Sequence, residues 1–280
     1  MEIRKLKKGV GAQALNFDLS TKLSPDELAR LNDALVDNVV LVIRDQRLTA
    51  TQLREAIAQF GELMEDQVRR YALPQEPFVS VLSNRHLDSK GKPAQIAANA
   101  TWHTDHTNLE RPPKFTCLYA LEIPERGGGT FVCNTRAAYA RLSAAWKQRL
   151  APLTTANVLI SSARADVANP DIIQDQIERA KSPVIHPLVR THPERDTQAL
   201  WFHKTKVENV VGMSPTQSQV FLDSLLDEII TDDVTYYHQW RIGDLLMIDN
   251  RSALHKADHV FDQVQHRKLY RMLVRGDRPH

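Results

Sequence analysis

The hydrophobic residues of the N-terminal part follow a helical period. Residues 24–27, Ser-Pro-Asp-Glu, combine an N-cap serine, a proline at the first helical position and an acid at the third, which is typical of a helix start. The apolar residues that follow recur on one helix face, at Leu28, Leu31 and Leu35. A second helix is predicted from about Thr51 to Phe60, with Gly61 positioned to end it.

Short apolar runs separated by turns dominate the rest of the chain. Residues 39–43, Val-Val-Leu-Val-Ile, form a continuous, mostly β-branched run that predicts a buried strand between the two helices. Further strands are predicted at 115–121, 130–133, 184–190, 199–203, 244–248 and 269–274, and helices near 143–150, 171–180 and 216–230. Many short strands with scattered helices indicate an antiparallel sandwich or barrel. The glycines at 127–129 fall in a hairpin turn, so they do not indicate a phosphate-binding loop.

Composition and charge exclude several classes of protein. The 280 residues carry a net charge of +2, which argues against a nucleic-acid partner. No stretch approaches about eighteen consecutive apolar residues, so no membrane span is expected. The charged residues 1–8 lack the apolar run of a signal peptide, and Cys117 and Cys133 cannot form a disulfide framework. We therefore expect a cytoplasmic protein with a single domain over residues 1–280.

A candidate metal site begins with residues 102–105, Trp-His-Thr-Asp. Side chains alternate in an extended segment, so His103 and Asp105 point to the same side. A histidine from a distant strand would complete a set of two histidines and one carboxylate. Such a set suits ferrous iron and leaves positions open for a cosubstrate and oxygen. The chain has 11 histidines, so the triplet alone is a weak signal.

The C-terminal part supplies the other candidates. Residues 240–255 read as a strand and a turn that end in His255. Arg267 and Arg271 lie four residues apart on the next predicted strand, so both point where Leu269 points. Two guanidinium groups on an inward face are costly to bury unless anions pair with them. A dicarboxylic acid would satisfy both through bidentate pairs, and structural ion pairs with Asp or Glu are the alternative.

Together these features resemble the taurine/2,4-dichlorophenoxyacetate (TauD/TfdA) family of iron(II)- and 2-oxoglutarate-dependent dioxygenases. The resemblance runs nearly end to end. Its motifs, in chain order, are Gly11-Ala12, Asp18-Leu19, residues 40–46, 59–63, 102–105, 127–130 and 186–193, residues 249–251 with His255, and Arg267 with Arg271. The number and order of these motifs make the resemblance specific.

The resemblance implies a fold and a metal centre. The fold would be a double-stranded β-helix (jelly roll) of the α+β class with flanking helices. His103, Asp105 and His255 match the iron(II) ligands of the family. The reaction would use iron(II), 2-oxoglutarate and O2, and would hydroxylate an organic substrate while forming succinate and CO2.

The resemblance also implies which residues bind the two organic molecules. Arg271 matches the arginine that pairs with the distal carboxylate of 2-oxoglutarate. Thr130 and Arg267 match positions that touch this cosubstrate. Asn99 matches a position that contacts the prime substrate in the taurine enzymes.

The chain departs from the taurine enzymes around the prime substrate. Asp66 and Arg69 stand where those enzymes carry a histidine and a tyrosine that bind the sulfonate. Lys206 stands in the place of an aromatic residue, and His106 in that of a small or apolar one. We therefore expect a small anionic or zwitterionic substrate other than taurine, held by Asn99, Arg69 and Lys206. Asp66 would neutralise Arg69 or bind an amine of a zwitterion.

Two other functions share the predicted architecture. A non-catalytic jelly-roll module would bind a sugar or peptide, but the complete set of His103, Asp105 and His255 argues against it. A metal-dependent jelly-roll enzyme without 2-oxoglutarate, such as an isomerase or thiol dioxygenase, is disfavoured by the two arginines after His255. We expect a small-molecule substrate and no nucleic-acid or membrane partner, and the sequence leaves a homo-oligomer open.

Overall fold

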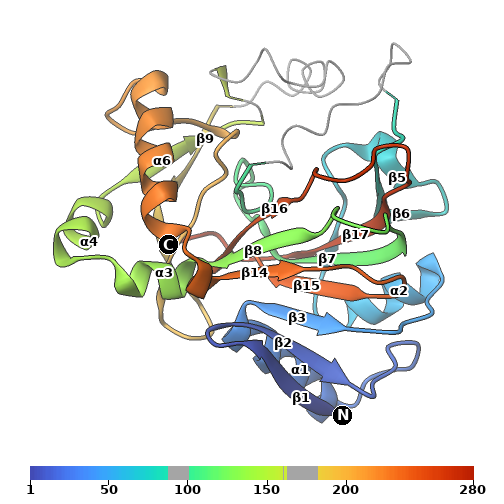
Figure 1. The fold of residues 1–280 in the computed structure, drawn as a ribbon. Helices are drawn as coiled ribbons and strands as arrows, with labels where there is room; N and C mark the ends of the chain where they lie inside the picture. The colour runs from blue at the N-terminus through green and yellow to red at the C-terminus, as the bar shows by residue number, and fades with distance from the viewer. Residues whose placement is uncertain (88–100, 160, 163–181) are drawn as a thin grey trace.

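Two β-sheets form the centre of the protein (Figure 1). The computed structural model describes residues 1–87, 101–159, 161–162 and 182–280. The larger sheet contains, in order, β1 (Glu2–Lys7), β2 (Val10–Leu15), β3 (Val40–Ile43), β15 (Leu245–Asp249), β7 (Pro113–Glu122), β17 (Lys268–Arg275), β6 (Glu76–Ser83) and β5 (Ala72–Leu73), with β4 (Leu63–Met64) paired to β17. The second sheet is β14 (Thr235–His238), β8 (Thr130–Asn134) and β16 (Ala253–Ala257). All pairings in both sheets are antiparallel except that of β2 with β3.

Smaller elements complete the described part of the chain. Two small sheets are formed by β10 (Val184–Pro187), β9 (Thr154–Asn157) and β13 (Val207–Val210), and by β11 (Val189–Thr191) and β12 (Gln198–Leu200). The helices are α1 (Pro25–Asn38), α2 (Ala50–Ala58), α3 (Thr135–Arg141), α4 (Ala144–Leu150) and α6 (Pro215–Ile229), with short 3-10 helices η1 (Arg69–Tyr71) and η4 (Asp232–Val234). The helix predicted at 171–180 lies outside the described residues. No helix within them is long and apolar enough to cross a membrane.

The predicted start of α1 is confirmed in detail. Ser24 Oγ accepts a hydrogen bond from the Glu27 N–H at 3.3 Å, and the Glu27 carboxylate accepts one from the Ser24 N–H at 2.9 Å. This reciprocal pair satisfies two backbone donors that the helix itself leaves free. One face of α1, including Leu31 and Leu35, packs into the core under the larger sheet.

The apolar run of β3 is buried on both faces. Val40 and Val42 belong to a core layer shared by the two sheets, together with Leu118 of β7 and Val132 of β8. The alternate residues of β3 face the other way, into the core formed with α1 and α2. A strand covered on both sides has no polar face, which explains why its sequence shows no alternation.

A second core lies at one end of the molecule, where α3, α4 and α6 cover the strands β11 to β13 (Figure 1). The strands predicted at 184–190 and 199–203 meet there as the antiparallel β11–β12 pair. The single strand predicted at 184–190 is wrong, because Leu188 separates β10 from β11. Leu188 bonds to Leu153 through its N–H and to Trp201 through its carbonyl, so each half pairs with a different partner.

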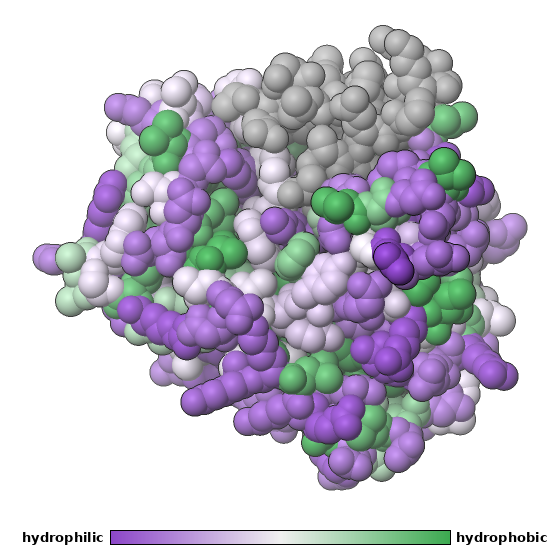
Figure 2. Space-filling model, viewed as in Figure 1, coloured by the Kyte–Doolittle hydropathy of each residue, from purple (hydrophilic) through white to green (hydrophobic). Residues whose placement is uncertain are grey.

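The arrangement is the jelly roll with flanking helices that the resemblance implied. Cys117 and Cys133 are free and buried. Figure 2 shows one face of the molecule, on which hydrophobic residues form small groups among hydrophilic ones. Scattered apolar groups of this kind are normal on a protein surface and indicate no particular partner.

Candidate active site

The residues of the predicted metal site lie together in the interior. His103 pairs with His255 of β16 across a short antiparallel bridge, with N–H to O contacts of 3.0 and 2.7 Å. Asp105 follows two residues after His103. One ligand atom from each of the three side chains lies within 4.8 Å of the other two, and all three residues are buried. The structure therefore brings together the three residues that the sequence predicted to hold iron.

The protonation of these side chains suits a metal ion. His103 Nδ1 donates to the Thr101 carbonyl at 2.7 Å, which leaves Nε2 unprotonated and 3.9 Å from Asp105. His255 Nε2 lies 3.9 Å from the other oxygen of Asp105. Burial lowers the pKa of both histidines, that of His255 to about 3, so both rings are neutral. Burial alone would raise the pKa of Asp105, but Arg271 and His255 hold it well below its usual value.

A buried chain of hydrogen bonds holds Asp105 in place. Thr116 Oγ1 donates to Asp105 Oδ2 at 2.5 Å, and Asn250 Nδ2 donates to Thr116 Oγ1 at 2.8 Å. The Asn250 carbonyl in turn accepts from Thr104 Oγ1 at 2.8 Å. Sequence reasoning missed Thr116, although a threonine between the apolar residues Phe115 and Cys117 was a visible signal.

The turn between β15 and β16 is fixed by a buried ion-pair network. Asp249 accepts from His192 Nε2 at 2.9 Å and from Arg251 Nε at 2.8 Å, and Arg251 also pairs with Glu194. Burial alone would raise the pKa of Asp249, but Arg251 and the hydrogen bond from His192 keep it far below its usual value. This turn leads directly into the strand that carries His255, so the network orients a metal-site residue from outside the site.

Thr130 lies on the same face of the second sheet as His255. In the pairing of β8 with β16, Thr130 is opposite Ala257 and Val132 is opposite His255. Residues directly opposite each other, and those two positions along, share a face. Thr130 is buried, and its hydroxyl accepts from Trp240 Nε1 at 3.2 Å.

The glycine turn before Thr130 contacts Arg267. Arg267 Nε donates to the Gly128 carbonyl at 2.6 Å. A side chain at position 129 would meet the Tyr237 ring at 2.4 Å, so this approach requires glycine. The glycines therefore allow Arg267 to pack against the turn that leads into Thr130.

Arg271 faces the space between the sheets, as the strand pattern predicted, and Arg267 directly precedes the same strand. Arg271 is opposite Leu118, a residue of the core shared by the sheets. It forms an ion pair with Asp66, and its Nη1 lies 3.7 Å from Asp105 Oδ1. Arg267 has no carboxylate within ion-pair distance among the described residues. Burial lowers the pKa of Arg267 to about 10, an effect that the charge of Asp258 opposes.

Four further polar residues form what we call the Lys206 cluster, namely Lys206, Gln67, Asn108 and His106. Lys206 Nζ donates to Gln67 Oε1 at 2.9 Å and to Asn108 Oδ1 at 2.8 Å, and His106 Nδ1 also contacts Gln67 Oε1 at 2.6 Å. His106 Nε2 lies 3.7 Å from Asp66. Burial lowers the pKa of Lys206 to about 8 and that of His106 to about 4. Gln67 and Asn108 were missed because only the folded chain brings them to the lysine.

The other predicted substrate residues are not part of this cluster. Arg69 lies on η1 with its side chain 71% exposed, and it pairs with Glu65 at 2.9 Å. Asn99 lies outside the described residues. The sequence also gave no indication of His203, a buried histidine whose ring centre lies 4.6 Å from that of His103.

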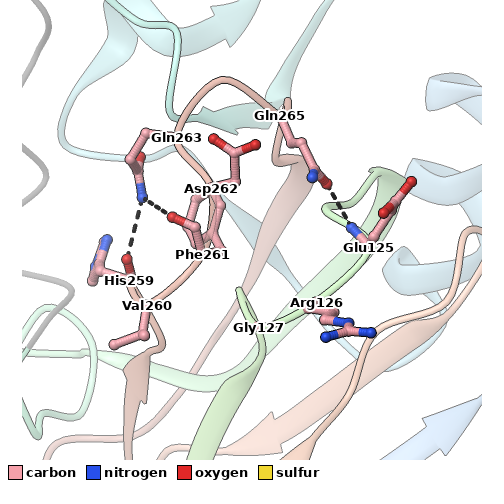
Figure 3. Close-up of a pocket in the computed structure, with 9 residues that line it drawn as sticks. All are labelled: Glu125, Arg126, Gly127, His259, Val260, Phe261, Asp262, Gln263 and Gln265. Atoms are coloured by element: carbon pink, nitrogen blue, oxygen red, sulfur yellow. Dashed lines mark hydrogen bonds between the residues drawn. The ribbon is translucent and has the colours of Figure 1, made fainter.

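A separate pocket of about 460 Å³ opens beside the glycine turn (Figure 3). It is lined by Glu125, Arg126, Gly127, His259, Val260, Phe261, Asp262, Gln263 and Gln265. None of the predicted site residues is among them. A side chain at position 127 would lie 2.0 Å from the Val260 carbonyl, so the glycine lets the loop after β16 pack on the turn.

Three comparisons with known proteins agree with this geometry. Residues 2–273 match the family model "Taurine catabolism dioxygenase TauD, TfdA family". The chain is similar to an alkylsulfatase of Acinetobacter baylyi, with 31% identity over 99% of this chain and 86% of that protein. It is also similar to an alpha-ketoglutarate-dependent 2,4-dichlorophenoxyacetate dioxygenase of Burkholderia sp., with 28% identity over 95% of this chain and 91% of that protein.

Solved structures show the same likeness. A taurine dioxygenase from Burkholderia xenovorans superposes with a TM-score of 0.80 at 28% identity, covering 99% of this chain and 92% of that one. AAD-2 in complex with Mn(II) and N-oxalylglycine superposes with a TM-score of 0.82 at 27% identity, covering 99% and 98% of the two chains.

Proposed function

Because the chain belongs to the TauD/TfdA family, we propose that it hydroxylates a small anionic organic substrate at an iron centre held by His103, Asp105 and His255. The enzymes of this family use iron(II), 2-oxoglutarate and O2. The observation that carries the proposal is the buried set of two histidines and one carboxylate with donor atoms within 4.8 Å of one another. A non-catalytic module, or an enzyme without 2-oxoglutarate, finds no support among relatives that are named alpha-ketoglutarate-dependent dioxygenases.

The donor set fits ferrous iron. His103, Asp105 and His255 would hold the ion through two neutral imidazole nitrogens and one carboxylate, and such a set would leave coordination positions open for other ligands. When bound, iron and 2-oxoglutarate supply the oxidising chemistry, with succinate and CO2 as coproducts. The chain contributes orientation: Thr101 fixes the ring of His103, and Thr116 fixes the carboxylate of Asp105.

We assign the distal carboxylate of 2-oxoglutarate to Arg267 and Thr130. The sequence predicted Arg271 for this role, but Arg271 already pairs with Asp66, whereas Arg267 has no carboxylate within ion-pair distance among the described residues. A partly buried guanidinium without a counter-ion favours an incoming carboxylate, because the pair removes an uncompensated charge. Thr130 adds a hydroxyl on the same side of the sheet as His255.

The prime substrate is proposed to carry an anionic group that binds near Lys206. Relatives are named for alkyl sulfates, sulfate esters, sulfonates and 2,4-dichlorophenoxyacetate, all of which carry one anionic group. Lys206 supplies a cation beside the metal site, while Arg69 is exposed and already paired. A role for Asn99 stays a prediction from the resemblance.

The remaining sequence predictions are carried forward as proposals. A single dioxygenase domain over residues 1–280 is supported by the family match over nearly the whole chain. A cytoplasmic location is supported by two free, buried cysteines, which suit a reducing compartment. The low net charge supports a small-molecule substrate without a nucleic-acid partner.

Succinate formation tests the proposed function. The protein is supplied with ferrous iron, 2-oxoglutarate and O2, and alkyl sulfates, alkanesulfonates, aryloxyalkanoates and amino acids are screened for stimulation. We expect one of the anionic classes to raise succinate formation and to be consumed in step with it. A neutral or cationic compound as the best substrate would contradict the anionic assignment, and no succinate under any condition would contradict the reaction class.

A further inference from the structure

A third histidine lies in line with the two histidines of the metal site. The backbone of His203 forms an antiparallel bridge with that of His103, which is itself bridged to His255. Residues directly opposite each other on paired segments point to the same face. The ring centres follow the same order, with 4.3 Å between His255 and His103 and 4.6 Å between His103 and His203. The side chain of His203 therefore faces the same side as the metal site.

His203 stands beside the metal ligands and is not one of them. Among the residues that the structure describes, the set of ligand atoms within 4.8 Å of one another consists of His103, Asp105 and His255. No carboxylate lies within ion-pair distance of His203 in that part of the chain. His203 is nevertheless 3% exposed. Its ring is thus buried next to the site without a metal to bind or an acid to pair with.

The hydrogen bonds of His203 determine which ring nitrogen carries the hydrogen. Nδ1 accepts from the Thr205 N–H at 3.3 Å and lies 3.2 Å from the Thr205 hydroxyl. A backbone N–H can only donate, so Nδ1 carries no hydrogen and Nε2 carries it. The contact lies within a short turn, in which the Lys206 N–H donates to the His203 carbonyl at 2.9 Å. The turn therefore holds Nε2–H as a donor in a defined orientation.

The Nε2–H group of His203 is unpartnered but not enclosed. It has no acceptor among the described residues. The fully enclosed polar atoms without a partner include His106 Nε2, His255 Nδ1 and Arg271 Nε. His203 Nε2 is not one of these atoms, so a molecule bound beside His103 can reach it. A buried N–H group without an acceptor costs free energy, and an oxygen atom of a ligand that accepts from it removes this cost.

We propose that His203 binds the prime substrate by donating its Nε2–H to an oxygen atom of the anionic group, and that it is a specificity-determining residue. The inference rests on the proposed function, which places an anionic group near Lys206. Lys206 acts on this ring, since burial, His103 and the charge of Lys206 lower the pKa of His203 well below its usual value. The expected ligand group is an oxyanion, as in a sulfate ester, sulfonate or carboxylate, because its oxygens accept charge-assisted hydrogen bonds.

Calorimetry with defined probes tests the proposal independently of turnover. The protein is loaded with Mn(II) and N-oxalylglycine, which occur together in the related AAD-2 structure. Hexyl sulfate, hexanesulfonate and hexanoate are the probes, and hexyltrimethylammonium, which offers no acceptor, is the comparison. We expect the wild type to bind at least one of the three anions more tightly than the ammonium compound. Binding of none of the anions would contradict the proposal.

Three substitutions separate the donor from the packing of the ring. His203→Gln can place an amide N–H where Nε2–H lies, whereas His203→Asn places its amide where Nδ1 lies, next to Thr205. His203→Phe keeps a ring against His103 and has no donor. We expect the asparagine and phenylalanine variants to bind the preferred anion about tenfold more weakly or worse, the loss expected for a hydrogen bond to a charged group. The glutamine variant should retain most of the affinity.

The order of the variants decides between the roles of His203. Anion binding by His203→Phe at the wild-type level would mean that the ring only packs against His103. Tighter binding by His203→Asn than by His203→Gln would mean that the contact with Thr205 is what matters. A loss of Mn(II) affinity as large as the loss of anion affinity would assign His203 to the support of the metal ligands. Each of these results would overturn the proposal.

Controls separate a loss of binding from a loss of folding. His259→Asn changes an exposed histidine and should bind the anions as the wild type does. Thermal unfolding is measured for every variant. Retained binding by His203→Gln, at the same unfolding temperature as His203→Asn, is the expected result. Equal weakness of these two variants would contradict the assignment of the donor to Nε2.

Succinate formation by the wild type keeps the two claims distinct. Absence of iron-dependent succinate together with the expected order of anion binding would contradict the proposed function and leave His203 as an anion-binding residue. Succinate formation with unchanged anion affinity in His203→Asn and His203→Phe would contradict the role of His203 alone.

Discussion

The metal-site residues and the Lys206 cluster are close in space but are held by different parts of the fold. His255 is on a strand, His103 is bridged to it through the backbone, and Asp105 is fixed by Thr116 of β7. The cluster residues come from connecting segments: Gln67 lies between β4 and η1, His106 and Asn108 precede β7, and Lys206 lies between β12 and β13. The first region is thus tied to the sheets by backbone and side-chain contacts, whereas the Lys206 side chain of the second is held by Gln67 and Asn108, which also lie outside the strands.

This difference separates the two tasks of the enzyme. Metal chemistry needs donor atoms in one fixed arrangement, which strands and buried hydrogen bonds provide. Substrate choice varies among relatives, and connecting segments change with little effect on the core. The departures from the taurine enzymes accordingly fall in the connecting segments, at Asp66, His106 and Lys206. We therefore expect mutations in the first region to abolish the reaction and mutations in the second to redirect it.

The largest effect is expected from the metal site. His255→Ala removes one of three donors, so the protein should lose most of its iron affinity and all succinate formation. His259→Ala, an exposed histidine four residues further on, is the matched control and should bind iron normally. Bound iron and succinate are measured in both variants. Wild-type oxygen consumption by His255→Ala would refute the ligand assignment.

A smaller effect is expected at the cosubstrate. Arg267→Ala should raise the 2-oxoglutarate requirement strongly, because a carboxylate left without its charged partner loses roughly 2–5 kcal/mol of binding. Arg275→Ala on the same strand pairs with exposed Glu62 and should leave the requirement unchanged. Titration of 2-oxoglutarate at saturating iron measures both. A larger effect of Arg271→Ala than of Arg267→Ala would restore the division of roles that the sequence predicted.

The support of Asp105 should matter less than the ligands themselves. Thr116→Val removes the 2.5 Å hydrogen bond from the Thr116 hydroxyl to Asp105. Loss of a hydrogen bond that orients a metal-binding side chain typically lowers metal affinity about 10–100-fold. Cys117→Ala alters the next residue of the strand, which faces the other core, and should change stability rather than iron affinity. Equal iron affinity of Thr116→Val and the wild type would mean that the sheet framework does not depend on this contact.

The smallest effect is a pH dependence of the second region. Lys206 has a pKa lowered to about 8, and only its protonated form attracts an anion. The affinity for the anionic substrate should therefore be complete below about pH 7 and fall about tenfold per pH unit above pH 8. The KM for the best anionic substrate is measured from pH 7 to pH 9.5. Lys206→Arg should flatten the profile, because arginine stays charged, and an unchanged profile would exclude Lys206 as the titrating group.

The sequence predicted the sheet framework better than the connecting segments. The capped start of α1, the buried strand β3 and the inward side of Arg271 all follow from local periods in the chain. His103, Asp105 and His255 were identified from the order of the family motifs along the chain. That order indicated which distant residues belong to one site, and hydrophobic periodicity cannot show this. β16 was not predicted as a strand, because its edges are set by pairing with β8.

The partners of the polar residues were beyond sequence reasoning. Asp66 was expected to neutralise Arg69, its near neighbour, or to bind an amine of the substrate, but in the fold it pairs with Arg271, which is 205 positions away. Lys206 meets Gln67 at a separation of 139 positions. Ion pairs and hydrogen bonds of this kind depend on how loops fold over the sheet, which hydrophobic patterns do not encode.

The most direct test of the account is the dependence of 2-oxoglutarate decarboxylation on ferrous iron in the wild type and in Asp105→Ala. We predict that the wild type converts 2-oxoglutarate to succinate only when iron(II) is added, and that an anionic substrate accelerates this conversion. Asp105→Ala should form little or no succinate at the same iron concentration. Succinate formation by the wild type without iron, or at an equal rate by Asp105→Ala, would contradict the assignment of the metal site.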